Sequence, residues 1–376
     1  MDRALDIDIE VAIIADYMNF GFHCREKPRE NGLRVAVVGA GPAGLSAAGY
    51  LACNGYSIDV YDKLPVPGGL IVHAIPPWRI PVERVLGGIK DLEERLGVKF
   101  ITKVKVYSGS EPRRDEGDEF AERTVGLEEI VDNYDLVLIS TGTWLSKIPR
   151  IPGSSARGVE SALSYVHKFK LYELGLINHK PEAGRRVLVV GGGYSAIDAA
   201  EWALRSKAEV YVAYRRTLRE APAGVYEMER IRRMGAEIIE LASPIEVIVE
   251  KDSVKAVKLQ RMQLGPPDET GRPKPIPVPG SEFTIEADVV VFATGESPTP
   301  PLQQAVDYMN KLGVKLDKDG RIIVDEMMRT GNPKIFAAGD VVTGPSKIGP
   351  AIKSGLYAAR FMHNLTQVKK AIAVER

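Results

Sequence analysis

The chain has 376 residues, of which 44% are hydrophobic and 27% charged, values typical of a globular protein with more than one core. Its 50 basic and 50 acidic residues cancel, so no overall charge favours nucleic acid or an anionic membrane as a partner. No apolar stretch approaches the length of a membrane span, and the acidic N-terminus does not resemble a signal peptide, so we expect a cytoplasmic protein.

Residues 1–32 are expected to form an extension, with helical apolar spacing from Asp8 to Met18 followed by a loop. The only cysteines, Cys24 and Cys53, do not form a C-x-x-C motif. This excludes a redox dithiol of the thioredoxin-reductase kind and a four-cysteine iron–sulfur cluster held by this chain alone. We expect Cys53 to be a small core residue of a helix and Cys24 to have a structural role.

A first glycine-rich turn follows the apolar run Val35–Val38, which is typical of a buried parallel strand. In such a joint the first glycine makes the turn, the second lets the backbone approach a pyrophosphate, and the third allows close packing of helix on strand. The helix that begins here offers N–H groups and a positive dipole end to phosphates. The turn therefore predicts a dinucleotide site at Gly39, Gly41, Pro42, Ala43 and Gly44.

The next strand ends in Asp62, whose carboxylate can accept hydrogen bonds from both ribose hydroxyls of an adenosine without a 2′-phosphate. We therefore assign FAD to this unit. Farther along, the pattern predicts a helix over Pro81–Leu96, a strand at Val98–Thr102, and a charged surface loop or hairpin tip over Gly109–Arg123. A buried strand at Asp135–Ser140 then leads into Thr141 and Gly142.

A second glycine-rich turn follows Val187–Val190 and contains Gly191, Gly193, Tyr194 and Ser195, with Ala196 in place of the last glycine. Here the position equivalent to Asp62 holds Tyr214, and Arg215 and Arg216 come next. Guanidinium groups bind phosphate oxygens in bidentate fashion, so this strand tip suits a 2′-phosphate and hence NADPH. The alternative is a solvated basic pair ahead of a helix.

We expect an α/β fold with two Rossmann-like dinucleotide-binding domains, the second inserted into the first. The FAD domain is predicted at 33–150 and 286–376, and the NADPH domain at 151–285. The proline-rich stretch Gly265–Gly280 marks the end of the inserted domain, and the strand Asp288–Ala293 leads into Gly295 as its counterpart leads into Gly142.

Near the end of the chain a short apolar strand closes on Gly339 and Asp340, and a helix is expected from about Pro350 to Asn364. Asp340 can approach the ribityl hydroxyls or the pyrophosphate of a flavin. The helix opening at Gly349 and Ala351 can stabilise negative charge at N1 and O2 of a reduced flavin. An ordinary turn with a helix cap is the alternative.

These motifs together resemble those of the glutamate synthase small chain and its relatives, from about Leu33 to the end of the chain. The resemblance is carried by Gly39–Gly44, Pro67–Leu70, Ile75–Pro81, Tyr214–Arg216, Pro266–Arg272 and Phe336–Pro345. It implies hydride transfer from nicotinamide C4 to flavin N5. It also implies FAD binding by Gly39, Gly41, Gly44, Asp62, Gly69 and Asp340, and NADPH binding by Gly191, Gly193, Ser195, Arg215 and Arg216. Leu70, Arg79, Thr141, Gly142, Tyr194, Gly295, Gly339, Gly349 and Ala351 complete the candidate cofactor-binding set.

Two features depart from this family. Its full-length members begin with a cysteine-rich domain that carries iron–sulfur clusters, and only about 32 residues precede the flavin motif here. In addition, Val72-His73-Ala74 replaces the usual Arg-Tyr-Gly, and we expect His73 to be structural. Both departures leave open whether glutamate synthesis is involved.

Hydride transfer to a flavin requires positioning more than acid–base chemistry, so we assign no catalytic side chain and no metal site. The leading hypothesis is an NADPH-oxidising, oligomeric flavoprotein subunit that supplies electrons to an iron–sulfur protein, a ferredoxin or a larger synthase-type subunit. A sulfide or polysulfide reductase with Cys24 as a persulfide relay is a second hypothesis. A redox-inert nucleotide-binding scaffold is the third.

Overall fold

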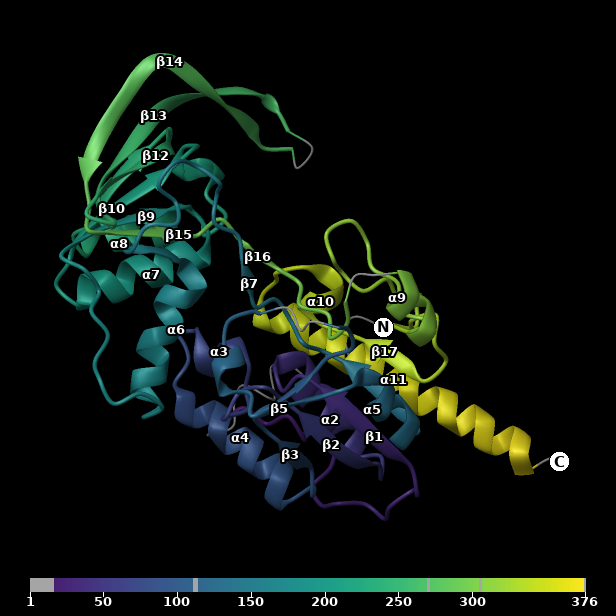
Figure 1. The fold of residues 1–376 in the computed structure, drawn as a ribbon. Helices are drawn as coiled ribbons and strands as arrows, with labels where there is room; N and C mark the ends of the chain where they lie inside the picture. Colours follow the sequence, from purple (N-terminus) through teal and green to yellow (C-terminus); the bar gives the residue numbers. More distant parts are fainter. Residues whose placement is uncertain (1–16, 111–113, 269–270, 304–305, 375–376) are drawn as a thin grey trace. The chain divides into compact units, whose positions relative to one another are not determined.

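The computed structural model describes residues 17–110, 114–268, 271–303 and 306–374, and the chain divides into two compact units (Figure 1). The first unit comprises Met1–Leu145 and Glu296–Arg376, and the second comprises Ser146–Gly295. The chain therefore leaves the first unit and later returns to it, at the paired short strands β7 (Leu145–Ser146) and β16 (Glu296–Ser297). Most of the helix expected from Asp8 lies outside the described residues.

The first unit is built on five parallel strands in the order β17-β6-β1-β2-β3. Their bounds are β1 Arg34–Val38, β2 Ser57–Tyr61, β3 Lys99–Ile101, β6 Leu136–Ile139 and β17 Ile335–Ala337. Val37 and Leu138 in the middle of this sheet are 0% exposed, as expected for strands covered on both faces. The strands expected at Val98–Thr102 and Asp135–Ser140 are thus confirmed as β3 and β6.

Two helices of the first unit approach each other closely enough to exclude a side chain. They are α2 (Pro42–Ala52) and α11 (Ile348–Val374). A methyl group at Gly355 would lie 2.1 Å from the Ala43 carbonyl oxygen, so glycine is required where they meet. This packing sets the start of α11 beside the first turn of α2.

The unit also contains α3 Leu70–His73, α4 Val82–Glu94, β4 Val104–Val106, η1 Asp118–Phe120, β5 Arg123–Val125, α5 Leu127–Asn133, α9 Val306–Leu312 and α10 Asp340–Thr343.

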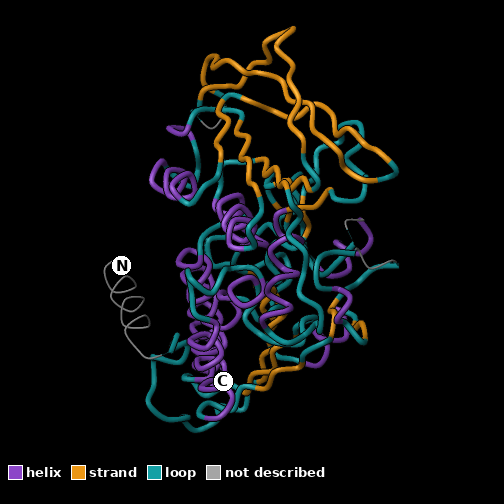
Figure 2. Tube along the Cα trace, turned by 90° about the vertical axis from the view of Figure 1, so that its left-hand side faces the viewer, coloured by secondary structure: helices purple, strands orange, loops and turns teal. Residues whose placement is uncertain are grey.

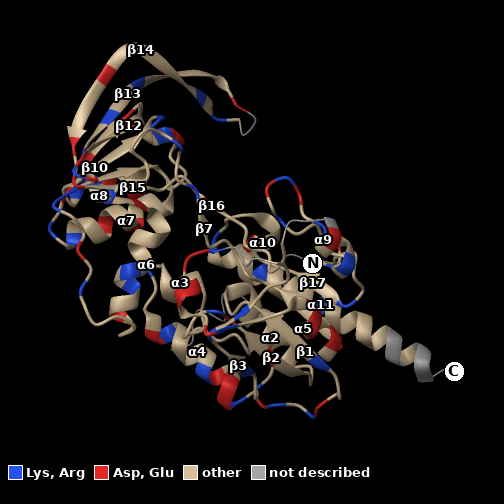
Figure 3. Cartoon of the chain, viewed as in Figure 1, with Lys and Arg blue, Asp and Glu red and all other residues tan. Residues whose placement is uncertain are grey.

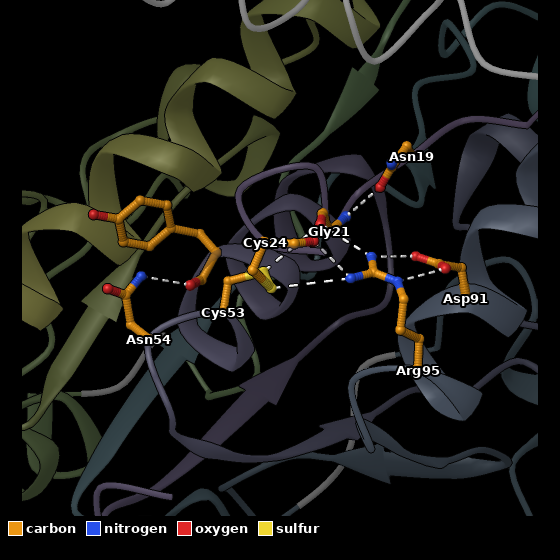
Figure 4. The surroundings of a disulfide bond; sticks show 8 residues. Asn19, Gly21, Cys24, Cys53, Asn54, Asp91 and Arg95 are labelled. Atoms are coloured by element: carbon orange, nitrogen blue, oxygen red, sulfur yellow. Dashed lines mark hydrogen bonds and ion pairs between the residues drawn. A yellow bond between two sulfur atoms is a disulfide. The ribbon is translucent and has the colours of Figure 1, made fainter. Parts of the chain in front are cut away.

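The segment before β1 is tied to α2 and α4 (Figure 4). Cys24 and Cys53 form a disulfide, a pairing that the sequence analysis did not predict but that agrees with the structural role expected for Cys24. Residues 20–24 run beside α2 as far as its last turn, which brings Cys24 to Cys53. Arg95 donates hydrogen bonds to the carbonyl oxygens of Gly21 (3.0 Å) and Cys24 (2.7 Å), and it pairs with Asp91 (2.6 Å).

The second unit has its own five-stranded parallel sheet, in the order β11-β10-β9-β15-β8. Its strands are β8 Val159–Ser161, β9 Arg186–Val190, β10 Glu209–Tyr214, β11 Glu237–Glu240 and β15 Val289–Phe292, and its helices are α6 Ala162–Glu173, α7 Tyr194–Arg205, η2 Leu218–Glu220 and α8 Val225–Arg233. β15 pairs with β9, so the domain end predicted at residue 285 falls too early. An apolar run such as Val-Val-Val-Phe suits the core of either sheet, and the sequence alone does not assign it.

A three-stranded antiparallel sheet completes the second unit, and its long strands are prominent in orange in Figure 2. It consists of β12 (Ala242–Glu250), β13 (Ser253–Pro267) and β14 (Pro273–Glu286). The proline-rich stretch Gly265–Gly280 therefore lies within a β-hairpin and does not mark a domain end. Four of its prolines, Pro273, Pro275, Pro277 and Pro279, lie on β14, which is an edge strand of this sheet, where proline is tolerated. Among the described helices of the whole chain, none is long and apolar enough to cross a bilayer.

Candidate functional site

The first glycine turn joins β1 to α2, and its three glycines meet different surroundings. Gly39 has φ +104°, and a methyl group there would lie 2.5 Å from the Ser140 carbonyl oxygen. A methyl group at Gly44 would lie 2.0 Å from the Gly39 carbonyl oxygen. Nothing lies within 4 Å of the position that a methyl group at Gly41 would occupy. Gly39 and Gly44 thus permit the turn and the packing, whereas Gly41 leaves space beside the backbone.

Asp62 lies at the carboxyl end of β2, next to this turn, and only 8% of it is exposed. Its Oδ2 accepts a hydrogen bond from the Ala40 N–H at 2.6 Å, and its Oδ1 accepts one from the Leu64 N–H at 2.9 Å. Burial raises the pKa of this carboxyl group above its ordinary value. The two backbone bonds hold the carboxylate in place, and each oxygen keeps a lone pair for a ligand hydroxyl.

A cavity of about 630 Å³ opens between the first glycine turn and the start of α11. It gathers predicted residues from several separate segments, namely Gly39, Gly41, Pro42, Ala43, Asp62, Gly69, Leu70, Thr141, Gly142, Gly339, Asp340 and Ala351. Residues that the sequence analysis missed also line it: Ile71, Ile75, Ser140, Thr143, Trp144, Lys347 and Ile348. Most of these directly adjoin predicted motif residues, so widening each motif by a few positions would have found them.

The far wall of this cavity carries the Gly-Asp pair that follows β17. Gly339 has φ +76° and donates its N–H to Ser354 Oγ at 2.9 Å. Asp340 accepts a hydrogen bond from Ser346 Oγ at 2.5 Å, and burial raises the pKa of the Asp340 carboxyl group. Three residues predicted for the flavin site, Gly44, Arg79 and Gly349, are not among those that line the cavity.

A second cavity of about 560 Å³ shares Asp62 with the first and extends toward Lys63. The Lys63 ammonium pairs with Asp115 and with Asp118 (3.1 Å), and it lies 5.0 Å from the centre of the Trp144 ring. Burial lowers the pKa of Lys63 to about 8. The expected surface loop or hairpin tip over Gly109–Arg123 is therefore wrong for Asp115 and Asp118, whose side chains are 7% and 17% exposed, whereas Glu119 and Glu122 are exposed as expected. The charge pattern indicated that this segment is polar, but it did not indicate that Asp115 and Asp118 pair with the buried Lys63.

His73 is fully buried in the first unit. Its Nε2 lies 2.7 Å from the Val66 carbonyl oxygen, and its ring centre lies 6.5 Å from that of Trp144, edge to face. These contacts agree with the structural role expected for this residue.

The second glycine turn joins β9 to α7 and repeats the first with one change. Gly191 has φ +149°, and a methyl group there would lie 2.6 Å from the Ala293 carbonyl oxygen, whereas Gly193 faces open space. Tyr194 begins α7 and is 38% exposed, with Ser195 next along the helix. Ala196 is fully buried, so this joint accommodates the methyl group that the first joint excludes at Gly44.

The strand tip beside this turn carries no acid. A methyl group at Gly192 would lie 2.7 Å from the Tyr214 ring, and the Tyr214 hydroxyl donates to the Glu220 carbonyl oxygen at 2.8 Å. Tyr214 thus covers the turn where Asp62 binds the backbone in the first unit. Gly295, at the end of the second unit, has φ +99° and accepts the Lys147 N–H at 3.0 Å; it lines neither cavity described above.

The two arginines after β10 differ in their surroundings. Arg215 is the more exposed of the two, and the desolvation of its covered part, together with the charge of neighbouring Arg216, lowers its pKa. Arg216 is 2% exposed and donates to Asp268 Oδ2 at 2.5 Å and to the Pro273 carbonyl oxygen at 2.7 Å. Of the two arginines predicted to bind NADPH, Arg216 is thus already bound by Asp268 and Pro273 of the β13–β14 hairpin.

With this geometry in place, comparison with known proteins identifies the family. The sequence model of the pyridine nucleotide-disulphide oxidoreductases matches residues 33–355. The chain belongs to this family. Family membership confirms an oxidoreductase that uses FAD and a pyridine nucleotide. Within the described part of the chain, no group of three or more His, Cys, Asp or Glu residues is arranged to hold a metal ion.

Two curated relatives show how far the likeness extends. A "glutamate synthase [NADPH] small chain" of Halomonas elongata is 34% identical over 86% of this chain and 66% of its own length. An "NADP(+)-dependent formate dehydrogenase subunit beta" of Moorella thermoacetica is 36% identical over 88% of this chain and 43% of its own length. The chain therefore spans about half to two thirds of these relatives.

Among solved structures, Mycobacterium tuberculosis FprA in complex with NADPH has a TM-score of 0.72 at 20% identity, over 90% of this chain and 86% of FprA. At this level of identity the match shows the fold alone. The expected α/β class with Rossmann-like sheets is confirmed.

Proposed function

We propose that the chain is a flavoprotein subunit that oxidises NADPH and passes the electrons through FAD to an iron–sulfur partner or a ferredoxin. The observation that carries this proposal is the difference between the two strand tips, with buried Asp62 at one and exposed Arg215 at the other. A carboxylate accepts hydrogen bonds from ribose hydroxyls and repels a 2′-phosphate, whereas a guanidinium group binds that phosphate.

In this proposal the first unit holds the flavin. The backbone at Gly39–Gly44 and the N-terminal end of α2 bind the pyrophosphate, and Asp62 binds the adenosine ribose. Gly339 and Asp340 lie where they can contact the ribityl chain, and the first turn of α11 offers its positive dipole end to the ring. When bound, FAD supplies a two-electron acceptor that can release electrons singly. The chain contributes positioning and exclusion of water.

The second unit is proposed to hold NADPH. Gly191, Gly193, Tyr194 and Ser195 form the pyrophosphate turn, in which the open face of Gly193 permits close approach. Arg215 binds the 2′-phosphate. No side chain is assigned an acid or base role, because hydride transfer moves no proton to or from the protein.

An electron-accepting partner is supported by the relatives, two of which are named as a small chain and a subunit. The polysulfide hypothesis required a free Cys24 thiol, but both cysteines of the chain are joined in the disulfide. Relay by Cys24 is therefore not proposed. The scaffold hypothesis becomes one outcome of the test below.

We also propose a cytoplasmic location, because metabolism keeps NADPH reduced there. The Cys24–Cys53 disulfide makes a second point to test, because stable disulfides are uncommon in that compartment outside hyperthermophiles. Fractionation of the source cells with immediate thiol alkylation tests both points. Recovery outside the cytoplasmic fraction would overturn the assignment.

The test of the proposed function is anaerobic stopped-flow mixing of the flavin-loaded protein with NADPH or NADH. We expect NADPH to bleach the flavin absorbance at concentrations at which NADH does not, and reduced protein to be reoxidised by a ferredoxin. Absence of bleaching with either nucleotide would support the inert scaffold. Bleaching that no iron–sulfur acceptor reverses would overturn the proposed acceptor.

A further inference from the structure

Segment 114–120 lies between β4 and β5, and buried ion pairs hold it against the end of β2. Asp118 Oδ1 lies 3.1 Å from the Lys63 ammonium nitrogen, and Asp118 also pairs with Lys105. Asp115 pairs with Lys63 as well, and its backbone N–H donates to Asp118 Oδ2 at 3.0 Å. The four side chains are only 7% to 17% exposed.

These pairs differ from the solvated charges elsewhere on the first unit. Acidic and basic residues are interspersed over this unit, including along α4 (Figure 3). The pair Lys90–Glu94 on α4 has side chains 69% and 67% exposed, so it contributes little to stability. Removing one member of a buried pair, in contrast, leaves the other member without compensation. The buried pairs therefore fix segment 114–120 in one position.

That position is directly beside Asp62. A methyl group at Gly117 would lie 2.5 Å from Leu64 Cδ2, so segment 114–120 packs closely on Leu64, whose N–H binds Asp62 Oδ1. Burial raises the pKa of the Asp62 carboxyl group, whereas its backbone hydrogen bonds and the charge of Lys63 lower it. Lys63 thus favours the ionised form of Asp62, which is the form that accepts hydrogen bonds from a ribose.

Segment 114–120 also reaches the place where the two cavities of the first unit meet. Asp62 and Trp144 line both cavities. The Glu116 N–H donates to the Trp144 carbonyl oxygen at 3.2 Å, and Asp115 lines the second cavity. The proposed function places the pyrophosphate of FAD at the first glycine turn and the ribose at Asp62, which leaves the second cavity for the adenine ring.

We propose that segment 114–120 closes the adenosine end of the flavin site and slows the release of FAD, with Asp118 as the positioning residue that fastens the segment. Asp118 lines neither cavity, so it acts through the segment and not by touching the cofactor. This role rests on the proposed function and adds to it that retention of FAD depends on a segment outside the parallel sheet.

The test compares FAD with FMN, which has the same ring and ribityl phosphate but no adenosine. Flavin fluorescence follows the release of FAD after dilution of the loaded protein, and it gives the Kd of each flavin for flavin-free protein. We expect Asp118→Ala to raise the release rate and the Kd of FAD about tenfold, as the loss of one charged hydrogen bond does, and to change the Kd of FMN less than about twofold. Glu119→Ala, which removes an exposed carboxylate at the next position, is the charge-matched control and should leave all three values unchanged.

Hydrogen exchange of the wild type gives a readout that needs no variant. The N–H groups of Glu116 and Asp118 donate to the carbonyl oxygens of Trp144 and Asp115. We expect both to exchange more slowly with FAD bound than with FMN bound, because the adenosine end holds the segment closed. Equal exchange rates in the two complexes would overturn the closing role, even if Asp118→Ala failed to fold.

The outcomes separate this role from the proposed function. If Asp118→Ala and Glu119→Ala release FAD equally fast, segment 114–120 does not retain FAD, and the proposed function stands. Equal losses of affinity for FAD and FMN in Asp118→Ala would also overturn the role, because the damage would not be confined to the adenosine end. If the wild type binds FMN as tightly as FAD, the adenosine contributes nothing, and the assignment of Asp62 to its ribose fails as well.

Discussion

The two glycine turns share one design and differ in what surrounds them. In the first unit the helix packs so closely that Gly44 has no room for a methyl group, and the strand tip presents a buried acid. In the second unit Ala196 is accommodated, and the strand tip presents exposed Arg215 next to buried Arg216, which Asp268 of a hairpin binds. The comparison teaches that the turn provides a general pyrophosphate site, while selectivity resides at the strand tip and in what packs on it.

The largest contrast is expected from exchanging the third residue of each turn. Gly44→Ala places a methyl group 2.0 Å from the Gly39 carbonyl oxygen, so the joint must open. We expect a loss of about 3 kcal/mol or more in the free energy of unfolding, together with loss of bound flavin. Ala196→Gly should cost only about 1 kcal/mol, through helix propensity, and should leave flavin content unchanged. Flavin absorbance and denaturant titration measure both, and equal effects would contradict the contrast.

A disulfide is found only in the first unit, and its removal should affect that unit alone. Cys24→Ser frees the segment before β1 from α2, and we expect the unfolding free energy of the first unit to fall by about 3 kcal/mol. Wild-type protein treated with a reductant should behave in the same way. Unfolding followed by flavin release reports on this unit. A change below about 0.5 kcal/mol would show that Arg95 and its backbone contacts suffice to hold the segment.

The buried lysine beside Asp62 gives the first strand tip a pH dependence. The pKa of Lys63 is lowered from 10.5 to about 8, so between these values the unfolded chain holds a proton that the folded chain has released. The contribution of Lys63 to stability therefore rises with pH across this window, by up to about 3 kcal/mol. Denaturant titrations of flavin-free protein should show a rise that Lys63→Met lacks and that Lys90→Met, at an exposed site, retains. Parallel pH profiles for wild type and Lys63→Met would contradict the burial of this ammonium group.

Local patterns predicted the strand–turn–helix joints, the acid that follows β2 and the arginines that follow β10, because each of these features depends on residues close together in sequence. The glycines at 39, 44 and 191 meet the close contacts expected of them for this reason. The motifs after β6 and β17 converge on the first cavity because the carboxyl ends of parallel strands share one edge of a sheet.

The features that sequence did not predict depend on contacts between distant segments. The Cys24–Cys53 disulfide requires the path of residues 20–24 along α2, which no periodicity encodes. Likewise, Arg216 binds the Asp268 carboxylate, which lies 52 residues away in sequence. Asp268 belongs to a hairpin whose prolines the sequence analysis interpreted as the end of a domain. The sequence analysis placed β15 in the FAD domain, whereas it pairs with β9 in the second unit. Its apolar run is compatible with the core of either sheet.

The central claim is that Asp62 and Arg215 assign two different dinucleotides to two similar turns. Flavin content and the ratio of the Kd values for NAD⁺ and NADP⁺, measured on the wild type, Asp62→Ala and Arg215→Gln, test it most directly. The account predicts that Asp62→Ala is purified with little flavin, whereas Arg215→Gln keeps its flavin and loses its preference for NADP⁺. Flavin loss in Arg215→Gln, or full flavin content in Asp62→Ala with an altered nucleotide preference, would contradict it.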